Sequence, residues 1–156
     1  MQDTALLEQL TDDIGIARQL LELVDQEFTA LDERNLTKLE AILAKKQPLL
    51  ALLAQHGAQR SQWLTGQQLT PDRAGLEAAA SRSKSGTLIL EQALALETEL
   101  ERCRSANERN GRLIHANQSA LGGMLHILQG KEDTPGLYDN RGGAAKNKPQ
   151  RPLSQA

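Results

Sequence analysis

The regular spacing of apolar residues constrains this chain more than any other feature of its sequence. Near the N-terminus they recur in steps of three and four, at Leu7, Leu10, Ile14, Ala17, Leu21, Val24, Phe28 and Leu31. A second series, interrupted by asparagines, runs through Ile89, Ala93, Leu96, Leu100, Cys103, Asn107, Asn110, Ile114, Asn117, Leu121, Met124 and Leu128. This spacing is typical of helices that pack along one another. We therefore expect long helices lying side by side.

A third apolar segment lies between these two series and has a broader apolar face. Its members are Leu36, Leu39, Ile42, Leu43, Leu49, Leu50, Leu52, Leu53, Trp63 and Leu64. That breadth indicates a helix that contacts two neighbours. Asn35 is suited to cap its start, after a tight turn that begins at Asp32, and Asp3 or Thr4 could cap the first helix. Pro48 is expected to kink this middle helix or to divide it at Gln47, because proline removes one backbone donor.

The second connection is less regular. Residues 65–68 break the pattern, after which Thr70 is expected to cap a weak helix that has Pro71 at its first position. The last long helix should begin near Thr87 and end near Gly130. The sequence thus predicts an all-α fold, an elongated antiparallel bundle of three long helices over residues 1–130. Residues 131–156, rich in proline, glycine and basic residues, should form a flexible tail.

Composition excludes several functional classes. The net charge is −2, with both signs interspersed, which argues against nucleic-acid binding. The start of the chain lacks the features of a signal peptide. The longest apolar run, from Pro48 to Ala54, is far shorter than the roughly 20 residues that span a bilayer. We expect a cytoplasmic protein without direct membrane insertion.

Residues suited to catalysis are also scarce. Of the three histidines, His115 and His126 would share a helix face but lie about 16 Å apart along it, too far to bind one ion. Cys103 falls on the apolar series, where a buried, inert thiol is expected. The sequence therefore predicts no metal site, no cofactor and no catalytic residue. An enzyme built on a helical bundle remains a weaker alternative.

The end of the last helix carries the strongest indication of function. Folding the chain about residues 33–34 and about residue 75 leaves residues 117–128 without a partner in their own chain. An uncovered apolar stripe marks a partner site or a self-association site. The asparagines in the series either fix the helix register or contact a ligand helix. In the tail, Tyr138 could anchor a partner, since aromatic residues are common hot spots.

Several of these elements together resemble the FlgN-like flagellar export chaperones. The resemblance rests on the N-terminal leucine series, the run from Lys45-Lys46 to Leu53, and Asn107-x-x-Asn110-Gly111-x-Leu113-Ile114. It also includes Leu125-x-x-Leu128-x-Gly130 and Tyr138-x-x-x-Gly142. The family implies a cytoplasmic type III export chaperone that binds the C-terminal helical segments of the hook-associated proteins of the hook–filament junction. It would prevent their premature assembly and deliver them to the export gate.

The resemblance also implies where these partners bind. The cargo-binding residues would be Asn107, Asn110, Leu113, Ile114, Asn117, Leu121, Met124, Leu125 and Leu128. Tyr138 is the position that fits docking on the export gate. Two alternatives remain open at this point: a structural coiled-coil scaffold that homodimerises through the C-terminal helix, and a sister chaperone family that serves another flagellar protein.

Overall fold

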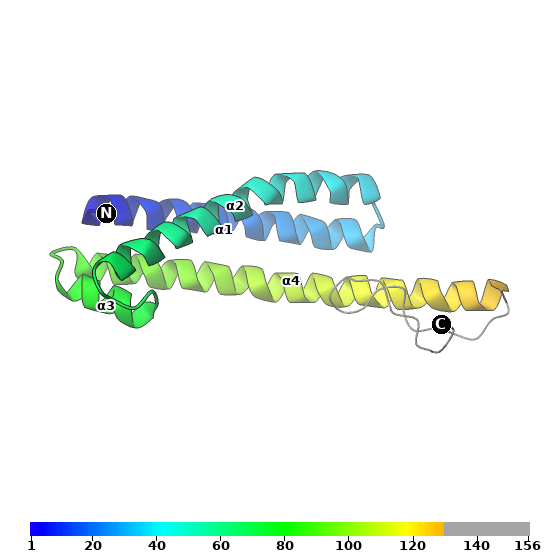
Figure 1. The fold of residues 1–156 in the computed structure, drawn as a ribbon. Helices are drawn as coiled ribbons and strands as arrows, with labels where there is room; N and C mark the ends of the chain where they lie inside the picture. Colours follow the sequence, from blue (N-terminus) through cyan, green and yellow to red (C-terminus); the bar gives the residue numbers. More distant parts are fainter. Residues whose placement is uncertain (130–156) are drawn as a thin grey trace, which may run out of the picture. The chain divides into compact units, whose positions relative to one another are not determined.

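The structure is a computed structural model that describes residues 1–129, and it gives side chains as far as residue 116. It contains α1 (Asp3–Asp32), α2 (Leu36–Gly66), α3 (Arg73–Ser81) and α4 (Gly86–Gln129), as Figure 1 shows. No strand occurs within residues 1–129. The all-α prediction is confirmed, but a fourth, short helix joins the three long ones. The tail predicted for residues 131–156 lies outside the described residues.

The chain divides into two compact units, and the boundary falls inside α4 between Asn107 and Glu108. The first unit contains α1, α2, α3 and the beginning of α4. All helix packing described below belongs to this first unit. The part of α4 from Glu108 onward is described only by its own backbone and by the exposure of its own side chains.

The turn between α1 and α2 forms as the sequence predicts. The Asn35 side-chain oxygen accepts a hydrogen bond from the Lys38 backbone N–H at 3.1 Å, which caps the start of α2. The two helices then run antiparallel, because Lys46 bonds Glu27 at 3.3 Å while Gln59 bonds Gln9 at 2.7 Å. This register is close to the one expected from folding the chain about residues 33–34.

The cap predicted for α1 is wrong. Gln2 occupies the cap position, and its side chain makes no capping hydrogen bond. Asp3 lies in the first turn instead, where its carboxylate accepts a hydrogen bond from the Ser83 hydroxyl. This bond ties the start of α1 to the turn before α4, so Asp3 is used for a tertiary contact.

Pro48 does not divide α2, which continues from Leu36 to Gly66. The ribbon of α2 changes direction along its length in Figure 1. A proline inside a helix leaves the carbonyl four residues earlier, here that of Ala44, without its usual donor. Ala44 is exposed, so water can satisfy that carbonyl.

The cap predicted for α3 is also wrong. Asp72, not Thr70, caps this helix, since its carboxylate accepts the Gly75 backbone N–H at 3.0 Å. The Thr70 hydroxyl donates to the same carboxylate oxygen at 2.6 Å. Pro71 therefore lies before the helix. The Thr70 hydrogen bond, followed by that from Gly75, lowers the pKa of Asp72 below its ordinary value.

The core of the first unit is centred on α1, which contacts both α2 and α4. One cluster joins α1 to the start of α4 through Leu6, Leu10, Ile14, Ala17, Ile89 and Leu96. Trp63 from α2 and Leu76 from α3 pack against it. A second cluster joins Ile16 and Leu20 to Cys103. Ser83, just before α4, bonds Asp3, and Arg18 bonds Glu99 at 3.2 Å. Because both contacts join residues about eighty positions apart, α1 and α4 run parallel.

Candidate functional site

The face of α4 that packs in the core contains some of the predicted residues, but neighbouring residues replace others. The buried residues of α4 are Gly86, Ile89, Leu96, Glu99, Cys103 and Ala106 and, beyond the boundary of the first unit, Asn110. Four of them, Ile89, Leu96, Cys103 and Asn110, belong to the predicted series. Of the remaining predicted positions up to residue 116, Ala93 is half-buried, and Leu100, Asn107 and Ile114 are exposed. Glu99 and Ala106 are buried in place of their neighbours Leu100 and Asn107.

This difference leaves an uncovered row along α4. Leu100 and Ile114 are each 40% exposed, and Asn107 between them is also exposed. Leu100 and Asn107 are seven residues apart, which places them on one helix face, and Ile114 follows at the same spacing in the sequence, beyond the boundary of the first unit. We call Leu100, Asn107 and Ile114 the α4 row. The helix continues to Gln129, and the sequence repeats the seven-residue spacing at Leu121 and Leu128.

The predicted cargo-binding residues occupy different environments. Asn110 is buried, with 2% exposure, and its side-chain oxygen accepts two hydrogen bonds of 3.1 Å from the Arg109 guanidinium. Asn107 and Ile114 are exposed, and Leu113 is half-buried. The other predicted residues lie on α4, but their side chains are outside the described ones: Asn117, Leu121, Met124, Leu125 and Leu128. Tyr138 lies outside the described residues altogether.

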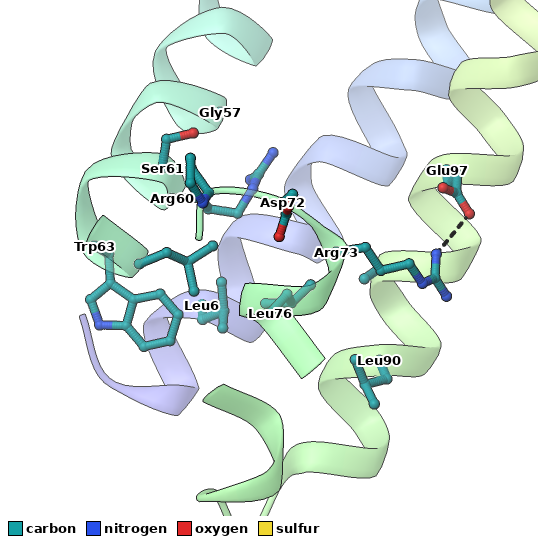
Figure 2. Close-up of a pocket in the computed structure, with 13 residues that line it drawn as sticks. Leu6, Gly57, Arg60, Ser61, Trp63, Asp72, Arg73, Leu76, Leu90 and Glu97 are labelled. Atoms are coloured by element: carbon teal, nitrogen blue, oxygen red, sulfur yellow. Dashed lines mark hydrogen bonds and ion pairs between the residues drawn. The ribbon is translucent and has the colours of Figure 1, made fainter. Parts of the chain in front are cut away.

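A separate cavity of about 260 Å³ lies in the first unit, where α2, α3 and α4 meet over the start of α1. Figure 2 shows Leu6, Trp63, Leu76 and Leu90 around it, so much of its lining is apolar. Charged side chains from α2, α3 and α4 also reach it. The cavity therefore combines apolar walls with charged side chains, as ligand-binding sites commonly do.

The charged groups around this cavity already have partners within the chain. Arg73 bonds Glu97 at 3.0 Å, as Figure 2 shows, and also Glu77 at 3.3 Å. Arg60 bonds Asp13 at 2.6 Å, and the Asp72 carboxylate caps α3. These groups hold the helices together, and none forms the nucleophile–base pair that covalent catalysis requires. The arrangement is that of a packing void between helices.

A buried polar cluster was not predicted from the sequence. The Asp13 side chain has no solvent exposure, and its two oxygens contact His56 Nδ1 at 2.5 Å and Arg60 at 2.6 Å. Asp13 lies between Leu10 and Ala17 on the core face of α1, so it was a visible polar exception. Its partners lie far away in sequence. Only the α1–α2 register brings them together.

Metal binding and membrane insertion are two further functions that a helical chain could have. Within that part, no group of three or more His, Cys, Asp or Glu side chains is arranged to hold a metal ion. No helix there is both long enough and apolar enough to cross a lipid bilayer.

Comparisons with known proteins identify the family. No curated protein matches the chain. Among solved structures, the chain is similar to a Pseudomonas aeruginosa protein described as a candidate flagella synthesis protein, FlgN. The two sequences are 41% identical, the TM-score is 0.68, and the match covers 82% of this chain and 98% of that one. The family model described as FlgN protein matches residues 1–146. Since this match spans nearly the whole sequence, the chain belongs to the FlgN family.

Proposed function

We propose that this chain is a flagellar type III export chaperone that acts in the cytoplasm. It binds the C-terminal helical segments of the hook-associated proteins that form the hook–filament junction. Binding prevents their premature assembly, and the chaperone then delivers them to the export gate. Membership of the FlgN family and the similarity to a flagella synthesis protein support a role in flagellum biogenesis. The choice of client and the delivery step belong to the proposal.

The α4 row is the observation that carries the proposal. Leu100 and Ile114 remain 40% exposed although they belong to an apolar series of core-like spacing. Leu121 and Leu128 continue the row with the same seven-residue spacing. A row of apolar residues that the core leaves open suits a second helix laid along it, as in helix-in-groove recognition. Such a helix would bury its own apolar stripe and could not pair with its assembly partners.

The proposal assigns different roles to the predicted residues. Asn107, Ile114, Leu121 and Leu128 lie on the row and would contact the client directly. The remaining cargo-binding predictions, Asn110, Leu113, Asn117, Met124 and Leu125, lie on neighbouring lines of the same helix. Tyr138 would dock on the export gate after the client has bound. Coupled folding and binding costs ordering entropy, so we expect a moderate affinity that permits release at the gate.

A binding assay with matched variants tests the proposal. The probe is a labelled peptide of the C-terminal helical segment of a hook-associated protein, followed by fluorescence anisotropy. Leu121→Asp combined with Leu125→Asp should abolish binding, and Ile114→Asp should weaken it by about tenfold or more. The control is Leu94→Asp. Leu94 is 50% exposed on the same helix but faces away from the row, so its replacement should leave binding unchanged.

Other results would reject the proposal. Equal binding by the wild type and the double variant would show that the end of α4 does not hold the client. Loss of far-UV helicity in the double variant would indicate that these leucines are core. A stable homodimer that does not bind the peptide would favour the coiled-coil scaffold.

For the tail, Tyr138→Ala should leave peptide binding intact and weaken docking on the export gate.

A further inference from the structure

The middle of α2 carries apolar residues all around the helix, with three polar residues among them. From Ala41 to Ala54 the only polar residues are Lys45, Lys46 and Gln47. A helix that is apolar all round is normally covered all round. The breadth of this apolar segment is why the sequence predicts two neighbours for α2.

The first unit covers only one side of this segment. Ile42 is its one buried residue, and Leu49 and Leu53 are half-buried beside it. The opposite side carries one exposed polar residue, Gln47, among six exposed residues that are small or apolar: Leu43, Ala44, Pro48, Leu50, Ala51 and Leu52. We call these six residues the α2 outer face. Leu43 and Leu50 are 52% and 50% exposed, so the uncovered side includes large apolar side chains.

The α2 outer face has the relief of a helix-packing surface. Leu43 and Leu50 are seven residues apart and form a projecting row. Ala44 and Ala51 form a parallel row of small side chains beside it. Ridges of large residues next to grooves of small ones let another helix approach closely. An extended strand or a flat protein surface would not fill the groove along Ala44 and Ala51, so a helix fits this surface better.

The charge of this region indicates what would flank the apolar stripe of a partner. No aspartate or glutamate occurs from Ala41 to Pro71. Lys46 pairs with Glu27 at 3.3 Å, whereas exposed Lys45 has no ion pair within the described residues. Lys45 lies seven residues before Leu52, at one edge of the outer face. An unbalanced cation at the edge of an apolar surface favours a partner with acidic residues there.

We propose that the α2 outer face is a docking site for an amphipathic helix of another protein. That helix presents leucine-like side chains to the row of Leu43 and Leu50 and an acidic flank to Lys45. The site is separate from the α4 row and goes beyond the client binding proposed above. Its existence does not depend on which client the α4 row takes.

Two synthetic peptides test this site. Both are three heptads long and carry the same leucine stripe, but one is flanked by glutamates and the other by lysines. Fluorescence anisotropy should show that the wild-type chain binds the glutamate-flanked peptide more tightly. Leu50→Glu should weaken that binding by about tenfold or more. Lys45→Glu should shift the preference toward the lysine-flanked peptide, because it reverses the charge at the edge.

Leu88→Glu is the matched control, since Leu88 is 47% exposed on α4 and lies outside the α2 outer face. Its binding should equal that of the wild type. The proposal is overturned if the wild type binds neither peptide, or if the α2 variants and the control behave alike. It is also overturned if Leu50→Glu unfolds the chain, which would make Leu50 core. Light scattering tests whether a second copy of the chain occupies the face instead. A dimer that Leu50→Glu converts to a monomer would assign the face to that second copy.

Discussion

The Asp13 carboxylate lies 2.6 Å from the Arg60 guanidinium, and the Asp13 side chain has no solvent exposure. The Arg60 side chain itself is 19% exposed, so the charge that is fully removed from water is the negative one. His56 is a second partner at 2.5 Å. The pair joins α1 to α2 in the half of the hairpin away from its turn and fixes which residues of the two helices are level.

Arg60→Met should therefore destabilise the chain strongly. The change leaves a buried carboxylate without its main counter-charge, which in proteins costs about 3–5 kcal/mol. Urea unfolding followed by circular dichroism measures the free energy of unfolding. Arg73→Met provides the comparison, because the ion pairs of Arg73 with Glu77 and Glu97 are more than half exposed. Exposed pairs contribute about 0–1 kcal/mol, so similar losses in the two variants would contradict the assigned role of Asp13.

Glu99→Leu should leave the stability unchanged or raise it by about 1 kcal/mol. The Glu99 side chain is 8% exposed, and one of its oxygens accepts hydrogen bonds from Arg18 and Arg102. Its other oxygen is buried and has no hydrogen-bond partner among the described residues. Both arginines are more than 60% exposed and remain hydrated after the change. Chemical denaturation would show a clear loss of stability if the carboxylate were instead essential to the fold.

The sequence predicts the helices well because caps and apolar spacing are local signals. Asn35 caps α2 as expected, and α4 begins within one residue of the expected place. At α3 the local signal is ambiguous, because both Thr70 and Asp72 can accept a backbone N–H. Their mutual hydrogen bond and the position of Gly75 decide in favour of Asp72.

The choice of the core face is where local signals fail. On α4, the apolar side chain of Leu100 suits a core better than the charged side chain of Glu99, yet Glu99 is the buried residue. Glu99 can be buried because Arg18, from another helix, reaches it. That contact depends on the α1–α4 register, which no residue of α4 encodes alone. On α1, similarly, Leu6 is buried and Leu7 half-buried because α1 has two neighbours.

Cys103 should react slowly in the folded chain. Burial, followed by the charge of Glu99, raises the pKa of its thiol above the ordinary value of 9.0. The thiol also donates to the Ala17 carbonyl at 3.2 Å. The thiolate is the reactive form, so iodoacetamide labelling near pH 8 should be much slower in native protein than in urea. Fast native labelling would mean that α4 separates from α1 readily.

The raised pKa of Cys103 also predicts a pH dependence of stability. A group whose pKa is higher in the folded state stabilises the fold fully below its unfolded pKa. That contribution is lost as the pH rises toward the folded pKa. The free energy of unfolding of the wild type should therefore fall relative to that of Cys103→Ala between about pH 8 and pH 10. Parallel pH profiles for the two proteins would contradict this account.

Gly75→Ala should destabilise the chain, although alanine is the better helix former by about 1 kcal/mol. A Cβ atom at Gly75 would lie 1.7 Å from the Thr70 carbonyl oxygen, so the turn before α3 would have to move. Overpacking of this kind costs about 1–3 kcal/mol. Gly57→Ala is the matched control inside α2, where a new Cβ would meet no atom within 4 Å. Thermal unfolding should show opposite signs for the two changes, with Gly57→Ala stabilising. Stabilisation by both would mean that the Thr70 turn does not hold the start of α3.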